Sequence, residues 1–362
     1  MKNKTLKTIG VLTLASLMST TSFSQVTIGG YTEVGFMTGG TTGTLAAQNS
    51  KGLGSETVIT IAGKGNLTNG WTYSAYQNLD SDDDKNGRNT ANVGPMTTRA
   101  IVLSPNKDFN LFYTFDGVYG GEIARTAVPT VTERVADMTG NASISEFIDV
   151  TSGTHAIGFD ALNLGPAGRL SVAYASNLDS QPQASSDRSY SGTGQVNYVN
   201  PASGYSIGYT VTPGPIKIAA GLTKIDQKQS ATAQDATSKT LGVQYNGSGF
   251  AVGAQRTKNE GLKAAQVTTA NFNDQVDTFA ASYALAKDIT IGGTYSKMER
   301  TGTAIATQGP DLKVYQAVIA YNLGPVVASV AYEDAKNRAV SNGATTSGLD
   351  TTSTKIKVKA NF

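Results

Sequence analysis

Residues 117–152 have the sequence GVYGGEIARTAVPTVTERVADMTGNASISEFIDVTS, and this long irregular run decides how the chain is interpreted. It separates two short segments, residues 110–116 and 153–162, that each predict a β-strand. A loop of this length inside a regular strand pattern is uncommon and usually functional. The charged residues in it are Glu122, Arg125, Glu133, Arg134, Asp137, Glu146 and Asp149. We predict that the chain closes into a membrane β-barrel and that this run folds into the bore.

The segments on either side of the run alternate with a period of two. Leu170, Val172 and Tyr174 fall on one face of a predicted strand, with Arg169 and Ser171 on the other. Charged residues make up only 15% of the chain, against about 25% in soluble domains, and mean hydropathy is −0.20. Strands that are apolar on one face and rich in Gly, Thr and Ser on the other fit a cylinder with lipid outside and water inside.

The connections between predicted strands alternate in length. Long polar runs separate seven short turns, at residues 66–70, 105–108, 165–168, 213–215, 246–249, 286–288 and 323–325. Short turns at one end and long loops at the other are typical of an outer-membrane barrel. The count predicts about sixteen strands of ~10 residues, or eighteen if the weakly alternating residues 189–199 form a hairpin. A soluble β-sandwich or solenoid would also alternate and is the alternative fold.

The amino end predicts export. Residues 1–24 combine an amino-terminal region with three lysines, an apolar stretch at residues 9–18, and Ser22 and Ser24 before Gln25. This is the pattern of a secretory signal peptide, with a buried amphipathic helix as the alternative. Residues 25–362 are then the barrel, and no other stretch approaches the ~20 apolar residues that a spanning helix needs.

The ends of the mature chain resemble the Gram-negative general porin family. Residues 25–31, QVTIGGY, look like its first strand after signal cleavage, and residues 357–362, KVKANF, are similar to its last strand, where a terminal Phe serves barrel assembly. The resemblance implies a homotrimer of sixteen-stranded barrels, each with its third outer loop folded inward as a constriction. Residues 117–152 are the third long loop and the longest. The Pro-Glu-Phe-Gly-Gly signature common in that loop is absent, and only Gly120-Gly121-Glu122 is faintly similar.

Charged residues on the predicted inner faces are candidates for lining the bore. If Ile356 and Val358 face lipid, the lysines that alternate with them face water, because a charge on the lipid face costs roughly 2–4 kcal/mol at the midplane. The predicted basic wall consists of Lys355, Lys357, Lys359, Arg169, Lys217 and Arg99, with Lys64 a further candidate. Acidic loop residues opposite it, Glu133, Asp137 and Glu146, would create a transverse field that screens solutes. Alternatively, these carboxylates are simply solvated at the mouth.

Residues 82–87, DDDKNG, contain the beginning of a calcium loop. Asp82, Asp84 and Asn86 are the candidate ligands. A full EF-hand loop needs a bidentate Glu at position 12, where this chain has Val93. A solvated acidic loop is therefore the alternative to a calcium site.

Nothing in the sequence predicts an enzyme. His155 is the only histidine, there is no cysteine, and no nucleophile–base pair is visible. The near-neutral net charge gives no reason to expect nucleic acid as a partner. We expect a passive outer-membrane channel for small hydrophilic solutes, in contact with membrane lipid and lipopolysaccharide. The alternatives are a non-conducting barrel for adhesion or anchoring, and a substrate-specific channel with an aromatic slide, for which Phe112 and Tyr76 are the candidates.

Overall fold

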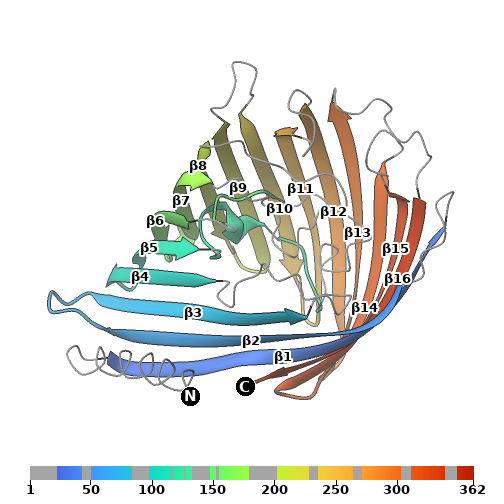
Figure 1. Cartoon of the computed structure of the whole chain (residues 1–362), viewed down its shortest axis with the longest axis horizontal. Helices are drawn as coiled ribbons and strands as arrows, with labels where there is room; N and C mark the ends of the chain where they lie inside the picture. Colours follow the sequence, from blue (N-terminus) through green and yellow to red (C-terminus); the bar gives the residue numbers. More distant parts are fainter. Residues whose placement is uncertain are drawn as a thin grey trace, which may run out of the picture.

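A single closed antiparallel barrel of sixteen strands is the architecture of the protein (Figure 1). The computed structural model describes residues 23–42, 50–83, 98–115, 117–125, 127–132, 147–151, 155–178, 202–227, 235–263, 271–302, 311–338 and 349–362. Within these residues each strand pairs with its neighbours in chain order, and β1 pairs with β16 to complete the ring. The predicted all-β barrel of sixteen strands is confirmed. Residues 189–199 lie outside the described residues, and the ring closes without them.

The strands run as follows: β1 Phe23–Thr42, β2 Ser50–Asn66, β3 Thr72–Asp83, β4 Arg99–Asn106, β5 Phe109–Phe115, β6 His155–Ala161, β7 Arg169–Leu178, β8 Ala202–Val211, β9 Ile216–Gln227, β10 Ala236–Asn246, β11 Phe250–Lys263, β12 Asn271–Ala286, β13 Ile289–Gly302, β14 Leu312–Asn322, β15 Val326–Arg338 and β16 Leu349–Asn361. Two short 3-10 helices, η1 (Gly120–Ala124) and η3 (Gly165–Ala167), lie in the connections. No helix among the described residues is long and apolar enough to cross a membrane.

The period-two pattern sets the two faces of the wall. On β14, burial alternates residue by residue, with Val314 and Gln316 buried and Tyr315 47% exposed. Large apolar side chains are exposed on other strands too, as at Leu241 and Phe279, and many of the buried inward-facing residues are small or polar, such as Ala173 and Ser206. This arrangement is the one that lipid outside and water inside require.

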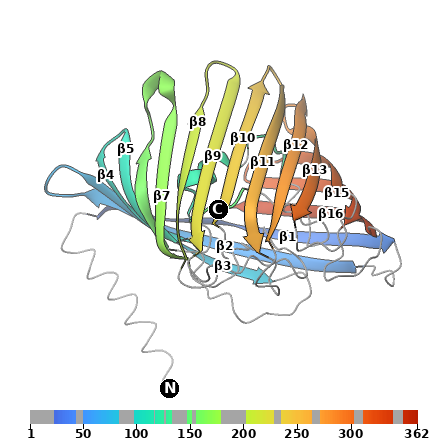
Figure 2. The same cartoon turned by 90° about the horizontal axis from the view of Figure 1, so that it is seen from above.

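Connection lengths alternate as the sequence predicts. Short turns join β2 to β3, β4 to β5 and so on to β14 and β15, while the longer connections leave the opposite end. Gly324 adopts φ +83° in the last short turn, a conformation that residues with a Cβ rarely adopt. Figure 2 shows strands β7 to β13 standing side by side as one continuous wall.

Strand length differs strongly around the ring. β1 and β2 have 20 and 17 residues, whereas β4, β5 and β6 have eight, seven and seven. The wall is therefore low at β4 to β6. The connection that holds residues 117–152 runs between β5 and β6, in this low part of the wall. β1 begins at Phe23, two residues before the predicted start of the mature chain.

The ring is closed by the two ends of the chain. The N–H of Phe362 donates to the carbonyl of Gly30 at 3.0 Å, and the N–H of Gly30 donates back to the carbonyl of Phe362 at 3.0 Å. From this pair toward the long-loop end, β1 and β16 stay in register from Tyr31 opposite Asn361 to Thr42 opposite Asp350. The terminal Phe362 thus belongs to the closing seam.

Candidate functional site

The first described part of the long run lies against the inner face of the wall. The N–H of Gly120 donates to Ser171 Oγ on β7 at 2.8 Å, and the N–H of Gly121 donates to Ser206 Oγ on β8 at 3.0 Å. Both serines are fully buried, on the face opposite the exposed apolar side chains. Figure 1 accordingly shows η1 inside the ring of strands.

The run then follows the wall around the barrel. The N–H of Ala127 donates to Gln255 Oε1 on β11 at 2.9 Å, and Gln255 Nε2 donates back to the carbonyl of Arg125 at 2.6 Å. Val131 packs against Val318 and Ala331, on β14 and β15. Residues 117–132, as far as they are described, therefore extend along the inside of the wall from β7 to β15.

Inward-facing glycines make room for this part of the run. Four of them each face one of its residues: Gly208 faces Gly120, Gly242 faces Ala127, Gly253 faces Pro129 and Gly292 faces Val131. A Cβ atom at Gly208 would lie 2.2 Å from the Gly120 carbonyl oxygen, and one at Gly242 would lie 2.3 Å from Ala127 Cβ. Such distances are too short for a Cβ atom, so only glycine permits this close approach.

The returning part of the run is fixed by a buried carboxylate. Asp149 is fully buried and accepts hydrogen bonds from the N–H groups of Glu122, at 3.1 Å, and Val150, at 2.7 Å. The N–H of Ile148 donates to Ser238 Oγ on β10 at 3.0 Å. Asp149 therefore joins the outgoing and returning parts of the run, and Ile148 ties the returning part to the wall.

Aromatic side chains fill the space between the run and the short strands. Phe112 of β5 is 4% exposed and stacks on Tyr119 with ring centroids 4.1 Å apart. Tyr76 packs on the same cluster. Burial raises the pKa of the Tyr119 hydroxyl above its usual value, so the ring stays uncharged. Phe112 is thus a packing residue, which removes one of the two aromatics proposed for a slide.

Acidic and basic side chains meet on the inner face of β1, β2 and β16. Lys357 and Lys359 alternate with the exposed Ile356 and Val358, and their Nζ atoms lie 3.4 Å and 3.9 Å from Glu33 Oε2. Two further contacts complete the group: Lys359 Nζ lies 3.2 Å from the Tyr31 ring centroid, and the Tyr31 hydroxyl donates to Glu56 Oε1 at 2.5 Å. We call Tyr31, Glu33, Glu56, Lys357 and Lys359 the wall cluster.

The wall cluster stands across the bore from η1. Contacts of η1 are mainly with β7, β8 and β9, and β8 and β9 are each eight positions away from β16 and β1 in the ring of sixteen. The barrel therefore has a folded-in segment on one side and a mixed-charge cluster on the other, which is an arrangement that can select solutes by size and charge.

Comparison with known proteins identifies the family. The family model for the Gram-negative porin matches residues 11–339. The chain belongs to this porin family. No curated protein sequence matches this porin.

Solved porin structures share the fold of this porin. An anion-selective porin from Comamonas acidovorans is 16% identical and superposes with a TM-score of 0.63, covering 93% of this chain and 99% of its own. A porin structure refined at 1.8 Å resolution is 14% identical, with a TM-score of 0.60, and covers 93% and 100% of the two chains. A loop-deletion mutant of OmpT, an outer membrane protein of Vibrio cholerae, is 9% identical and superposes with a TM-score of 0.59. The match covers 93% of this chain and 99% of the OmpT chain. At these identities the likeness establishes the fold.

The structure places most of the predicted basic residues of this porin on the inner face. Lys355 shares its face with Lys357, and Lys217 shares its face with the fully buried Ala219. Arg169 forms two hydrogen bonds with the buried Asp160, through Nε at 2.9 Å and Nη2 at 2.5 Å. Arg169 is therefore neutralised by a wall carboxylate, not by the loop.

The sequence predicts Arg99 in the bore, but the structure places it on the outer face of β4. On β4 the residues that face the bore are Ala100 and Val102, which are buried in the cluster beneath the long run. Arg99 lies on the opposite face with Ile101, which is 52% exposed, and its guanidinium carbon lies 4.8 Å from the Phe115 ring centroid. Successive side chains of a strand point to opposite faces of the sheet. Because Ala100 and Val102 occupy the inner face of β4, Arg99 points outward.

Of the charged residues of the loop, Glu122, Arg125 and Asp149 are described. Arg125 Nε lies 2.9 Å from Glu122 Oε1, and both side chains are largely buried. Outside the described residues lie Glu133, Arg134, Asp137 and Glu146, as do the calcium candidates Asp84 and Asn86. For Asp82, at the end of β3, only the backbone is described. Calcium binding stays a prediction, and no group of three or more potential metal ligands occurs among the described residues.

Glu33 and Glu56 were missing from the predicted site. The signal for Glu33 was present in the sequence, because Val34 and Phe36 mark the lipid face of the first strand and place Glu33 on the other. What the sequence does not show is the register that sets Glu33 opposite Lys359 and Glu56. The basic wall predicted from β16 therefore carries its own counter-charge.

Proposed function

We propose that this porin is a passive diffusion channel for small hydrophilic solutes and ions across the outer membrane. The observation that carries the proposal is the bore itself, in which a folded-in segment faces a cluster of two carboxylates and two lysines. Polar, charged linings exchange water for solutes without tight binding, as a diffusion channel requires. The proposal includes no catalytic step, in keeping with the porin family to which the chain belongs.

Single-channel recording of the refolded protein in a planar bilayer tests this function. We expect open conductance in steps of three, because the proposed assembly is a homotrimer. The reversal potential under a salt gradient then gives the sign of the selectivity. A correctly folded, heat-modifiable barrel that conducts nothing would contradict the proposal and leave the adhesion or anchoring alternative.

The outward side of the low wall is where we place the contact between subunits. Arg99 and His155 face outward there, and Tyr113, Phe115 and His155 form one cluster. The Tyr113 hydroxyl lies 2.6 Å from His155 Nδ1, and the Phe115 and His155 rings are 4.9 Å apart. An Arg facing lipid costs roughly 2–4 kcal/mol at the midplane, so cover by a neighbouring subunit stabilises the barrel.

Replacing Arg99 by Glu should therefore weaken the trimer. The new carboxylate cannot make the cation–π contact with the Phe115 ring. It would also put a negative charge where the wild-type subunit presents a positive charge to its neighbour. Light scattering of the detergent-solubilised protein should show a larger monomer fraction than in the wild type. Lys287→Glu, in the short turn between β12 and β13, makes the same charge change far along the ring and should leave the trimer intact. Equal trimer fractions in wild type and R99E would refute this placement.

Export by a cleaved signal peptide at residues 1–24 completes the proposal. It is supported by the sequence pattern of the amino end and by family membership, which implies an outer-membrane β-barrel. Amino-terminal sequencing of the exported protein should begin at Gln25. Intact residues 1–24 in the mature protein would count against it.

A further inference from the structure

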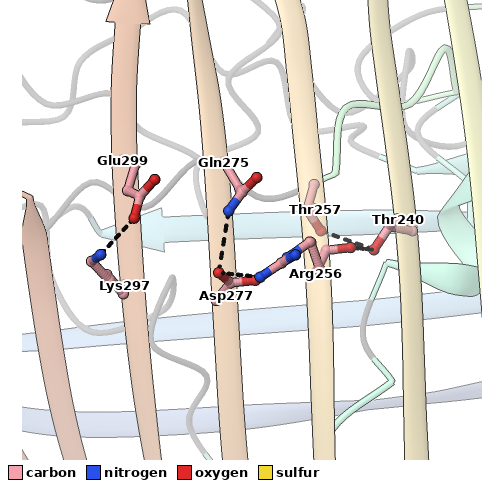
Figure 3. A network of polar contacts seen from close by, with 7 residues as sticks. All are labelled: Thr240, Arg256, Thr257, Gln275, Asp277, Lys297 and Glu299. Carbon is pink, nitrogen blue, oxygen red and sulfur yellow. Dashed lines mark hydrogen bonds and ion pairs between the residues drawn. The ribbon is translucent and has the colours of Figure 1, made fainter.

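Polar side chains on the inner face of β10 and β11 are bonded to one another or to the run. Thr240 and Thr257 share a hydrogen bond between their hydroxyl oxygens, 2.8 Å apart, as Figure 3 shows. Ser238 Oγ donates to Asn259 Oδ1 at 2.5 Å and accepts from the N–H of Ile148 at 3.0 Å. The outward-facing charges of β11 to β13 in the same view also form ion pairs. On this side of the barrel, polar groups of the wall thus find partners in neighbouring strands or in the run.

Buried polar side chains on β14 to β16 differ from this pattern. Gln316, Glu333 and Ser353 lie opposite one another in the strand register, face inward and are at most 5% exposed. We call these three residues the polar row. Neither the amide group of Gln316 nor the hydroxyl of Ser353 has a hydrogen-bond partner within the described part of the chain. Because buried polar groups are normally bonded, Gln316 and Ser353 indicate that a further group lies over the polar row.

The charge of Glu333 determines what kind of group this is. Glu333 is 1% exposed, and a carboxylate buried from water is stable only when a cation or several donors compensate its charge. Among the described inward-facing bases, Lys355 is the nearest in the register, opposite Ala331. Its side chain leans toward β1, however, with Cε 3.8 Å from where a Cβ atom on Gly35 would lie. The polar row therefore fits a positively charged group with several donors that comes from the side of the bore.

The run reaches the edge of the polar row. Val131 packs against Val318 and Ala331, which lie opposite each other, two residues closer to the short-turn end than Gln316 and Glu333. Two residues of a strand rise about 7 Å, and two residues of extended chain span about the same distance. The chain that follows Val131 can therefore come level with the polar row within about two residues.

The sequence after Val131 matches the order of side chains on the wall. Beyond the polar row, the next inward-facing residues of β14 and β15 are Val314 and Ala335, both fully buried. The wall is thus apolar, polar and apolar again toward the long-loop end. The run follows the same order, with Val131, then TER at residues 132–134, then VA at residues 135–136. This match favours the run as the occupant of the polar row.

We propose that Arg134 docks on the polar row and holds the run against β14 to β16 through an ion pair with Glu333. Arg134 is the only lysine or arginine between residues 126 and 152. Its guanidinium has five N–H donors, enough to bond the Glu333 carboxylate, the Gln316 amide oxygen and the Ser353 hydroxyl. Arg134, predicted from the sequence to line the bore, is thereby a positioning residue. The inference rests on the proposed channel only in that the run bounds the bore.

A double-mutant cycle on the refolded full-length channel tests the pair. Arg134→Gln and Glu333→Gln each release the run, so each should raise the rate of brief current interruptions about tenfold, in the range of coupling between residues in contact. The double variant should show the same tenfold rise, because the second change removes nothing more. Arg134→Lys should restore most of the quiet conductance, since it keeps the charge. Glu260→Gln, on the outer face of β11, is the matched control and should record like the wild type.

Cross-linking tests the contact without any current. The natural chain has no cysteine, so a short bifunctional thiol reagent joins only introduced cysteines. We expect it to join the two positions in the folded Arg134→Cys, Glu333→Cys double variant. Arg134→Cys with Lys217→Cys is the control, because Lys217 faces inward on β9, six strands from β15 in the ring, and this pair should stay separate.

Each outcome supports or overturns the pair. Multiplied effects in the double variant overturn it, because the two residues then act independently. If Lys355→Gln reproduces the effect of E333Q and R134Q does not, Lys355 is the partner and the proposal fails. A folded barrel in which the reagent does not join positions 134 and 333 also refutes the docking. A channel that conducts without this cross-link fails the inference alone, and a barrel that cross-links but conducts nothing fails the proposed function alone.

Discussion

Glu33→Gln should shift the selectivity of the channel toward anions. Glu33 is the carboxylate that both Lys357 and Lys359 approach, at 3.4 Å and 3.9 Å, so its removal leaves two inward-facing lysines with less compensation. A unit charge about 5 Å from a passing ion contributes about 0.8 kcal/mol even in bulk water, which is about a fourfold change in the ratio of anion to cation permeability. The effect should shrink at high salt, because mobile ions screen the charge.

The reversal potential under a salt gradient measures this change directly. Glu260→Gln is the matched control, because Glu260 also pairs with a lysine but lies on the outer face of β11. It should leave the reversal potential unchanged. An E33Q channel with the wild-type reversal potential would show that the wall cluster does not govern the ions, and the undescribed loop carboxylates would then be the candidates.

Adding a methyl group beneath the folded-in run should narrow the bore and destabilise the barrel. Gly208→Ala and Gly242→Ala would each place a Cβ atom within 2.3 Å of the run, at the Gly120 carbonyl oxygen and at Ala127 Cβ. Because β8 and β10 are held in place by hydrogen bonds to their neighbouring strands, the run must move toward the open part of the bore. Overpacking of this kind costs about 1–3 kcal/mol. We expect a lower single-channel conductance and a lower unfolding temperature.

Gly35→Ala provides the control for both glycine variants. Gly35 also faces the bore, but a Cβ atom there would meet only ordinary contacts, the closest at 3.5 Å from the Ile356 carbonyl oxygen. Its conductance should equal that of the wild type. If G208A and G242A conduct like G35A, the run yields without cost, and its place against the wall does not set the width of the channel.

Turn chemistry and side-chain parity explain what the sequence could predict. Short turns such as residues 323–325, with Gly and Pro between alternating strands, set the number of strands and the end from which each loop leaves. Parity placed Lys357 and Lys359 on the inner face, because Ile356 and Val358 leave no other choice. At Arg99 the same reasoning failed, since a short strand of eight residues beside a long loop offers few alternations from which to judge its faces.

The remaining features depend on contacts between distant parts of the chain. Glu33 meets Lys357 only because the first strand pairs with the last in one particular register. The glycines that face the run are ordinary strand glycines in the sequence, and their purpose appears only when Gly120 and Ala127 lie above them. Local patterns carry no information on either relationship, so the wall cluster and the track of the run could not be derived from them.

The seam between β1 and β16 also determines what an incomplete chain can do. Because the partners of the last strand are β15 and the first strand, the ring stays open until the final residues, including Phe362, are in place. A chain that ends before Leu349 would expose the unpaired edges of β1 and β15, and exposed long edges are templates for pairing with other chains. Aggregation, and not a smaller barrel, is therefore the natural fate of a truncated product. The wall of the barrel is complete only when the carboxyl-terminal strand has paired with β1.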